Sequence, residues 1–326
     1  MNKNVLVTGG AGYIGSHACK ALFQNGYVPI TFDNLSTGHR DFVKWGPFHK
    51  GDLLDQEDLE EVFNKFEIFS VMHFAASASV SESIANPIKY YRQNLQGTVN
   101  LLEIFVSKGG KQFIFSSSCA TYGESKSENI IETSEQVPIN PYGFSKLAIE
   151  KLIVDLERIH KFNFAILRYF NAAGADLDSE LGERHASETH VIPLLIKAAL
   201  SGNQFTIFGN DYQTLDGTAI RDFVHVTDIA VAHLRALEFT RMKSSNVVCN
   251  LGTGIGVSVL ELVTHVERIS EQIKINFEDR RAGDPARLVA SNEMSKELLN
   301  MKYTNSSLTT IFDTALNWHK KELENF

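Results

Sequence analysis

Short apolar runs alternate with longer segments of helical periodicity through the first half of the chain. Most of the runs are rich in β-branched or aromatic residues, and a polar or glycine-rich stretch follows almost every one. This alternation is typical of βαβ units, which assemble into a parallel sheet. The pattern predicts strands over Asn4–Thr8, Val28–Asp33, Phe48–Asp52, Ser70–Phe74, Gln112–Ser117 and Phe164–Tyr169.

The second half of the chain alternates less clearly. Turn residues are frequent between Gly182 and Gly254, which predicts that this segment forms much of a smaller, irregular lobe capping the sheet. We therefore expect an α/β chain. Residues 1–175, with segments that return to them later, form a doubly wound parallel sheet, and residues 176–326 mainly form the smaller lobe.

Composition narrows the class of partner. The net charge of −8, from 31 basic and 39 acidic residues, provides no broad positive surface, so we do not expect nucleic acid to bind. A small phosphorylated ligand is still compatible with this charge, because a few arginines and helix N-termini can bind it locally.

The cysteines and the apolar runs bear on metals and on location. Cys19, Cys119 and Cys249 are odd in number and widely spaced, without a C-x-x-C pair or clustered histidines. This argues against a disulfide framework and a structural zinc site, and we expect no metal. No run approaches the roughly 18 apolar residues of a membrane helix. We expect a cytoplasmic protein without a membrane partner.

A glycine pattern stands directly after the first predicted strand. Gly9, Gly12 and Gly15 form G-x-x-G-x-x-G and lead into a helical segment. The first two would let the backbone approach a pyrophosphate at the helix N-terminus, and Gly15 would let the helix pack on the strand. The alternative is a tight strand-to-helix turn that binds no ligand. With a ligand, residues 1–175 are a Rossmann-like dinucleotide-binding domain.

Two acidic residues at strand ends suggest which dinucleotide binds. Asp33 ends the second strand, where a carboxylate accepts hydrogen bonds from the adenosine ribose, and Asn34 follows it. This favours NAD over NADP, although Arg40 stands nearby. Asp52 could accept a hydrogen bond from the adenine amino group, or it could cap the helix ahead of Leu59.

The candidate chemistry lies at the start of a later helix. Tyr142 and Lys146 are four residues apart and share one helix face. A neighbouring ammonium and a nicotinamide cation would favour the phenolate of Tyr142, which could then accept a proton from a sugar hydroxyl. Ser118 could share a hydrogen bond with the reacting oxygen. Taken singly, the three residues could be a capping aromatic, a solvated charge and a turn former.

Together these features resemble the extended short-chain dehydrogenase/reductases and, more closely, the UDP-glucose 4-epimerases. The resemblance covers essentially the whole chain. The matching segments are V-T-G-G-A-G-Y-I-G-S-H at 7–17, D-N-L-S at 33–36, H-F-A-A at 73–76, N-L-Q-G-T at 94–98, P-Y-G-F-S-K at 141–146, L-R-Y-F-N-A-A-G-A at 167–175, F-G-N-D-Y-Q-T-L-D-G-T-A-I-R-D-F-V-H-V-T-D-I-A at 208–230 and R-R-A-G-D at 280–284.

The resemblance implies a set of NAD contacts and a homodimer. Lys146, besides its charge, would hydrogen-bond the nicotinamide ribose. The homodimer would form through the helices near residues 90–107 and 142–160. The implied NAD contacts are Gly9, Gly12, Tyr13, Ile14, Gly15, Asp33, Asn34, Ser36, Asp52, Leu53, Phe74, Ala75, Ala76, Asn94, Lys146 and Tyr169.

The smaller lobe would bind the substrate. The guanidinium groups of Arg221 and Arg281 match diphosphate oxygens if they converge; alternatively, they are surface arginines paired to Asp222 and Asp284. The resemblance implies that both bind the diphosphate of a UDP-hexose. It implies further substrate contacts from Ser118, Tyr142, Asn171, His190, Phe208 and Asp284.

The implied reaction inverts C4 of the hexose through a 4-keto sugar, with Tyr142 as the base. UDP-glucose and UDP-galactose would interconvert. Leu288 stands where some relatives have a bulky tyrosine, so UDP-N-acetylhexosamines are further candidate substrates. Ala78, Ala120 and His190 depart from residues common in the family, which weakens the transfer of individual ligand contacts.

Other functions fit parts of the pattern. A nucleotide-sugar 4,6-dehydratase needs an acidic pair beside the serine, and Ser118-Cys119-Ala120 supplies no carboxylate. A UDP-glucuronate decarboxylase or 4-epimerase shares the early chemistry and is excluded less firmly. A catalytically silent NAD-binding sensor would have no need of Tyr142, Lys146 and Ser118.

Overall fold

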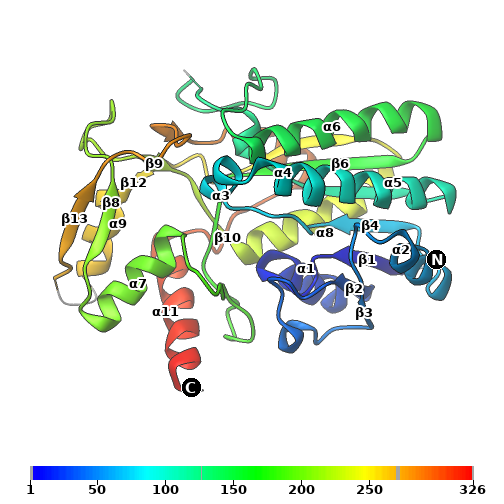
Figure 1. Cartoon of the computed structure of the whole chain (residues 1–326), viewed down its shortest axis with the longest axis horizontal. Helices are drawn as coiled ribbons and strands as arrows, with labels where there is room; N and C mark the ends of the chain where they lie inside the picture. The colour runs from blue at the N-terminus through cyan, green and yellow to red at the C-terminus, as the bar shows by residue number, and fades with distance from the viewer. Residues whose placement is uncertain (1–2, 126, 269–271, 325–326) are drawn as a thin grey trace.

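The structure is a computed structural model that describes residues 3–125, 127–268 and 272–324. Its larger lobe contains a seven-stranded parallel sheet in the order β11–β6–β5–β4–β1–β2–β3 (Figure 1). The expected Rossmann-like doubly wound sheet is therefore confirmed. Its strands are β1 (Asn4–Thr8), β2 (Val28–Asp33), β3 (Phe48–Lys50), β4 (Ser70–His73), β5 (Gln112–Ser118), β6 (Asn163–Tyr169) and β11 (Val247–Leu251).

Helices cover both faces of this sheet, which explains why its strands are apolar along their length. Val5 and Val7 of β1 pack toward α1 (Tyr13–Gln24) and α8 (Val226–Lys243). Leu6 between them packs toward the opposite layer, because successive side chains of a strand alternate between faces. That layer consists of α2 (Gln56–Lys65), α5 (Gly97–Ser107) and α6 (Pro141–His160), and Figure 1 shows α5 and α6 running along one side of the molecule.

Strand β11 and helix α8 lie within Gly182–Gly254, the segment expected to form much of the smaller lobe. The structure instead pairs β11 with β6 and packs α8 against the sheet. The turn residues on either side of these elements hid a βαβ unit that returns the chain to the sheet. The division of the chain near residue 175 stays a prediction.

The smaller lobe has its own core, formed mainly by α7 (Val191–Ser201), α9 (Val259–Glu267) and α11 (Leu308–Glu324) with β8 (Phe205–Phe208). Strand β8 pairs in parallel with β13 (Ile275–Glu278). Its other short strands are β7 (Asn171–Ala173), β9 (Ile220–Arg221), β10 (Phe223–His225), β12 (Val257–Ser258) and β14 (Arg287–Leu288). The remaining elements are the helices η1 (Arg40–Phe42), α3 (Val80–Ala85), α4 (Pro87–Tyr90), η2 (Tyr91–Gln96), η3 (Cys119–Thr121) and α10 (Glu293–Leu299).

The strand ends carry most of the predicted site. Two predicted strands end later than the observed ones, since β3 ends at Lys50 and β4 at His73. After β4 the backbone N–H groups of Phe74 and Ala75 both donate to the Thr8 carbonyl, so the chain turns away from the ladder here. Among the described residues, no helix is long and apolar enough to cross a membrane.

Candidate active site

The turn between β1 and α1 depends on its glycines. Gly9 has φ +71°, and a Cβ on Gly15 would lie 2.2 Å from the Gly9 carbonyl oxygen. A Cβ on Gly9 would lie 2.7 Å from the Ala75 nitrogen, so side chains at these positions would collide with backbone. Gly12 is the N-cap of α1, and no side chain caps this end of the helix. The free backbone N–H groups of the first helical turn therefore face the glycine turn. This is a cradle that fits a pyrophosphate.

The ends of β2 and β3 are joined by side chains. Asp33 accepts hydrogen bonds from the backbone N–H of Ala11 at 3.0 Å and of Leu35 at 2.8 Å, and burial raises the pKa of its carboxyl group. Asn34 Nδ2 donates to Asp52 Oδ2 at 2.9 Å. Arg40, the residue that left NADP open, has its guanidinium carbon 4.6 Å from the centre of the Phe48 ring.

The alternative role considered for Asp52 is wrong. Asp55, not Asp52, caps α2, with its carboxylate accepting from the N–H groups of Glu57 and Asp58. Asp52 instead accepts from Asn34 and from the Leu54 N–H. Leu53, which follows it, is buried. The backbone N–H of Ser36 donates to Asn34 Oδ1, so the two predicted NAD contacts share one turn.

Asn94 joins the loop after β4 to helix α6 through side-chain hydrogen bonds. Its Oδ1 accepts from the Ser77 N–H at 2.8 Å, and its Nδ2 donates to the Ser77 carbonyl at 3.0 Å and to Ser145 Oγ at 3.1 Å. Asn94 lies in η2, a π-helical segment. Insertions of this kind often occur at functional sites. Asn94 thus fixes the loop that carries Ala75 and Ala76 against α6.

Other predicted NAD contacts lie around the same strand ends. The Tyr13 hydroxyl donates to the Gly174 carbonyl at 2.6 Å, while Ile14 packs at the edge of the core. The Phe74 ring lies 4.6 Å from the ring of His233 on α8. Tyr169, at the end of β6, shares a hydrogen bond of 2.7 Å with Ser116 Oγ.

Tyr142, Lys146 and Ser118 converge where β5 ends and α6 begins. The side chain of Asn140 caps α6 by accepting from the Gly143 N–H, and Pro141 occupies the first turn. This start places Tyr142 beside Ser118, whose side chain lowers the Tyr142 pKa. Lys146 Nζ donates to the Ser116 carbonyl at 2.7 Å and lies 5.9 Å from the centre of the Tyr142 ring.

Burial dominates the protonation of this group. Tyr142 is 8% exposed and Lys146 is 3% exposed. Burial raises the pKa of Tyr142 well above its usual value, and the side chain of Ser118 only partly opposes this. Burial also lowers the pKa of Lys146 to about 7, against the attraction of Glu150. In the polypeptide alone the lysine does not make the phenol acidic, so additional positive charge near the phenol is needed to favour the phenolate.

A buried polar network joins helix α6 to the neighbouring strands β5 and β6. Glu150 accepts from Arg168 through both carboxylate oxygens, at 2.9 and 2.7 Å, and from Ser117 Oγ at 2.5 Å. Arg168 Nη1 also donates to the Tyr122 hydroxyl. The sequence analysis missed this network, although Tyr142, Lys146 and Glu150 recur every four residues on one helix face.

In the smaller lobe Arg221 and Asp284 form an ion pair. Asp222, in contrast, does not pair with an arginine: its carboxylate accepts from the backbone N–H groups of Thr253, Gly254 and Ala290, and it is fully buried. Of the two pairings considered as alternatives, only the one to Asp284 forms, and it involves Arg221. Asn171 Nδ2 donates to the Asp222 carbonyl at 3.2 Å.

Arg281 lies on the ring of Phe208, with its guanidinium carbon 3.8 Å from the ring centre. The two residues line one hollow of ≈ 460 Å³ together with Glu278, Asp279 and Arg280. The loop that carries Arg281 also reaches α6, because a Cβ on Gly283 would lie 3.7 Å from Asn140 Cβ. Arg281 and Phe208 therefore lie in a region that adjoins the first turn of α6.

The side chain of His190 points toward Glu183, in the loop before α7, and not toward Arg221 and Arg281. Its Nδ1 lies 2.5 Å from Glu183 Oε1, and the charges of Glu183 and Glu188 raise its pKa to about 9 although burial opposes this. Leu288 packs with Cys119, next to Ser118, in a small buried cluster.

The chain is similar to known proteins over almost its whole length. Residues 5–252 match the model of the NAD dependent epimerase/dehydratase family. The chain is 45% identical to a UDP-glucose 4-epimerase of Rhizobium leguminosarum bv. trifolii over 98% of both chains. A Brucella ovis UDP-glucose 4-epimerase in complex with NAD is 46% identical, with a TM-score of 0.92 over 97% of this chain and 98% of that one. The UDP-Glc/GlcNAc 4-epimerase of Campylobacter jejuni is 38% identical, with a TM-score of 0.85 over 98% of this chain and 100% of that one.

Proposed function

Because the chain belongs to the NAD dependent epimerase/dehydratase family, we propose that it is an NAD-dependent isomerase that interconverts UDP-glucose and UDP-galactose. The observation that carries this proposal is the convergence of Tyr142, Ser118 and Lys146 at the end of β5. A proton acceptor, a hydrogen-bond partner and a cation there are the groups that reversible oxidation of a secondary alcohol requires.

The cradle around Gly9 fits the cofactor. The turn at Gly9, Gly12 and Gly15 would hold the pyrophosphate, Asp33 the adenosine ribose, and Lys146 the nicotinamide ribose. The remaining NAD contacts implied by the resemblance stay part of the proposal. Bound NAD supplies a hydride acceptor that returns the hydride, and a positive ring charge that favours the Tyr142 phenolate.

In the proposed reaction Tyr142 accepts the proton of the hexose C4 hydroxyl as the C4 hydride leaves, which yields a 4-keto sugar. Ser118, which lies beside Tyr142, would donate a hydrogen bond from its hydroxyl group to the reacting C4 oxygen. Arg221 and Arg281 hold the diphosphate, with Phe208 against uracil, so that the keto sugar can turn over while its nucleotide stays bound. The hydride would then return to the opposite face of C4, and Tyr142 would return the proton to the C4 oxygen, which gives the hexose with the inverted hydroxyl group.

Asn171, His190 and Asp284 complete the proposed substrate contacts. Asp284 already pairs with Arg221, so binding of a diphosphate would have to share or replace that ion pair. The side chain of His190 is turned toward Glu183, and its contact with the substrate stays a prediction.

Incubation of the purified protein with UDP-galactose tests the function. We expect UDP-glucose to form without added cofactor, and NAD to be released when the protein is denatured. No product, together with no bound dinucleotide, would contradict the proposal. NAD without epimerisation would favour the silent sensor, and loss of carbon dioxide from UDP-glucuronate would favour the decarboxylase.

UDP-N-acetylglucosamine is a second candidate substrate. Leu288 lies in the same small cluster as Cys119, and a leucine occupies less space there than a tyrosine. The similar Campylobacter jejuni protein is a UDP-Glc/GlcNAc 4-epimerase. We expect turnover of both substrate types in a panel, whereas turnover of UDP-glucose and UDP-galactose alone would limit the function to these hexoses.

The homodimer also belongs to this proposal. Ile88, Tyr91, Phe144 and Ile159 are exposed on or beside the helices that the sequence analysis named for it. Apolar side chains gathered on helices are common at subunit interfaces. Analytical ultracentrifugation should therefore find twice the chain mass. The cytoplasmic location expected from the sequence stays a prediction.

A further inference from the structure

Four side chains of the loop before α7 point their polar atoms at one spot. Glu183, His185, Glu188 and His190 each offer one nitrogen or oxygen atom, and these atoms lie within 4.8 Å of one another. His190 Nδ1 lies 2.5 Å from Glu183 Oε1 and 3.6 Å from Glu188 Oε1. His185 Nδ1 lies 3.5 Å from Glu183 Oε1 and 3.3 Å from Glu188 Oε2. We call these four residues the Glu–His cluster.

The two carboxylates of the Glu–His cluster are buried without a lysine or arginine. The side chain of Glu183 is 5% exposed and that of Glu188 is 3% exposed. In the described part of the chain, the only ion pairs that they form are with His185 and His190. The two carboxylates carry two negative charges, and the imidazolium of His190 beside Glu183 compensates only one of them, whereas a divalent ion would compensate both.

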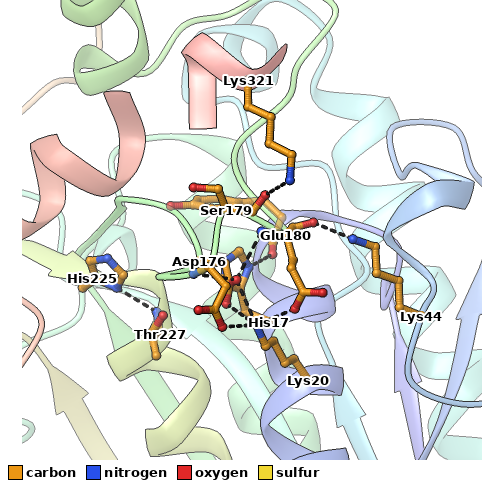
Figure 2. A network of polar contacts seen from close by, with 11 residues as sticks. His17, Lys20, Lys44, Asp176, Ser179, Glu180, His225, Thr227 and Lys321 are labelled. Carbon is orange, nitrogen blue, oxygen red and sulfur yellow. Dashed lines mark hydrogen bonds and ion pairs between the residues drawn. The ribbon is translucent and has the colours of Figure 1, made fainter. Parts of the chain in front are cut away.

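A second acidic cluster shows how this protein compensates buried charge elsewhere. Asp176, Asp178 and Glu180 also meet closely, but Lys20 Nζ lies among them at 2.9, 3.3 and 2.7 Å (Figure 2). The lysine occupies the place that a cation would take. Loop 176–180 is held further by Lys44 and Lys321, which donate to backbone carbonyls. Of the two clusters found among the described residues, the Glu–His cluster is the one without a lysine among its donors.

The donors of the Glu–His cluster suit a transition metal. Two imidazole nitrogens and two carboxylate oxygens are ligands that Zn²⁺ accepts in four-coordinate sites. Metal–ligand bonds of about 2.0–2.2 Å place the ligands of a tetrahedron about 3.4 Å apart. The four histidine–carboxylate contacts of 2.5–3.6 Å, which involve Oε1 of Glu183 and both oxygens of Glu188, lie around this value, and one donor atom from each residue lies within 4.8 Å of the other three. We propose that Glu183, His185, Glu188 and His190 bind one divalent transition-metal ion of the zinc class.

The position of the cluster gives the ion a structural role. The Glu183 carbonyl accepts from Trp318 Nε1 of α11 at 3.1 Å, and His190 is the residue that precedes α7. The loop also contacts the larger lobe, because His39 Nε2 lies 2.9 Å from the Arg184 carbonyl oxygen. A bound ion would fasten this loop between the two lobes. The spacing of the cysteines predicted no metal. The signal for this cluster is a different one, the E-x-H pattern that occurs twice, at 183–185 and 188–190.

Zinc chloride is the probe for this site. Untagged, NAD-bound protein is freed of metal with a chelator, and zinc is then titrated in competition with a chromophoric chelator. We expect one equivalent to bind and to raise the melting temperature, because an ion that binds only the folded state stabilises it. We expect His185→Asn and Glu188→Gln to weaken this binding on the order of 100-fold. His160→Asn, which removes an exposed histidine of α6, is the matched control and should bind as the parent does.

Absence of saturable binding in the parent protein would overturn the proposal, and so would equal affinity in the parent and in folded His185→Asn. X-ray absorption spectroscopy at the zinc edge, on the zinc-loaded parent protein, gives a test that needs no variant. Imidazole and oxygen scatterers at about 2.0–2.2 Å are expected. Sulfur scatterers, or a shell without imidazole, would place the metal elsewhere. None of these measurements depends on epimerase activity.

Discussion

The two halves of the candidate site are built in different ways. Tyr142, Lys146 and Ser118 lie at the end of a parallel strand and in the first turns of a helix, and each is almost fully buried. Arg281 and Phe208 lie in a turn and at the end of a short strand of the smaller lobe, where Arg281 is exposed. Electrostatic effects are larger in the buried half, because less water screens its charges. We therefore expect changes there to alter chemistry and stability, and changes in the exposed half to alter substrate binding.

Replacement of Tyr142 should have the largest effect. Tyr142→Phe removes the proposed proton acceptor and keeps the ring, so we expect kcat to fall by about 10³-fold. NAD content should stay the same, since the phenol is not needed to hold the dinucleotide. Steady-state turnover of UDP-galactose and the absorbance of released NAD measure the two quantities.

Tyr91→Phe is the matched control, because it removes a hydroxyl from a tyrosine that is 38% exposed and packs on Phe144. Its kcat should equal that of the parent. Near-normal turnover in Tyr142→Phe would remove this residue as the base and would leave the buried half without its main function.

The buried half was also the more predictable one. The alternation of apolar strands and helices predicted six of the seven sheet strands, because strands buried on both faces are apolar throughout. Ligands collect at the carboxyl ends of such strands, which identified Gly9, Asp33 and Ser118. Strand β11 was missed because it follows α8 within a stretch rich in turn residues, and only its pairing with β6 reveals that it belongs to the sheet.

Glu150 should matter for stability more than any exposed charge. Glu150→Gln leaves Arg168 buried without its carboxylate, so we expect the free energy of unfolding to fall by about 3 kcal/mol. Denaturant unfolding with the NAD content matched measures this value. Asp155→Asn, on the same helix, breaks an exposed pair with Arg158 and should cost less than about 0.5 kcal/mol. Equal losses in the two variants would show that burial does not distinguish these ion pairs.

Arg281 probes the exposed half. Arg281→Ala should raise the KM for UDP-galactose about 30-fold and leave kcat within about threefold, because a hydrogen-bonded charge pair contributes about 2 kcal/mol. Initial rates over a range of substrate concentrations separate the two constants. Arg158→Ala is the control, since Arg158 is an exposed arginine of α6 that pairs with Asp155, and its KM should equal that of the parent. A fall in kcat with unchanged KM would mean that Arg281 acts on the chemistry.

The substrate half could be predicted only in part. Spacing alone left Arg221 and Arg281 open to pairing with acidic neighbours, and Arg221 does pair with Asp284. Asp222 stands next to Arg221 in sequence but binds the backbone of two distant segments, which no local pattern reveals. Turns carry little periodicity, so the contacts of their side chains depend on tertiary structure. The same holds for His190, whose orientation toward Glu183 follows from the path of its loop.

The smallest expected effect tests how dry the buried half is. Burial lowers the pKa of Lys146 to about 7 in the folded protein, below the ordinary value of 10.5. The unfolded chain therefore binds more protons between these two pKa values, and the lysine destabilises the fold most at pH 7 and below. Lys146→Met removes this cost. The melting temperature of the variant relative to the parent should thus be higher at pH 7 than at pH 9.5, by about 2–4 °C.

Loss of NAD contacts would lower the variant's melting temperature at both pH values, so the change between them is the diagnostic quantity. Lys151→Met, at an exposed position of the same helix, should show no such change. A pH-independent difference for Lys146→Met would mean that water reaches the ammonium group and that the two halves of the site are less different than their burial indicates.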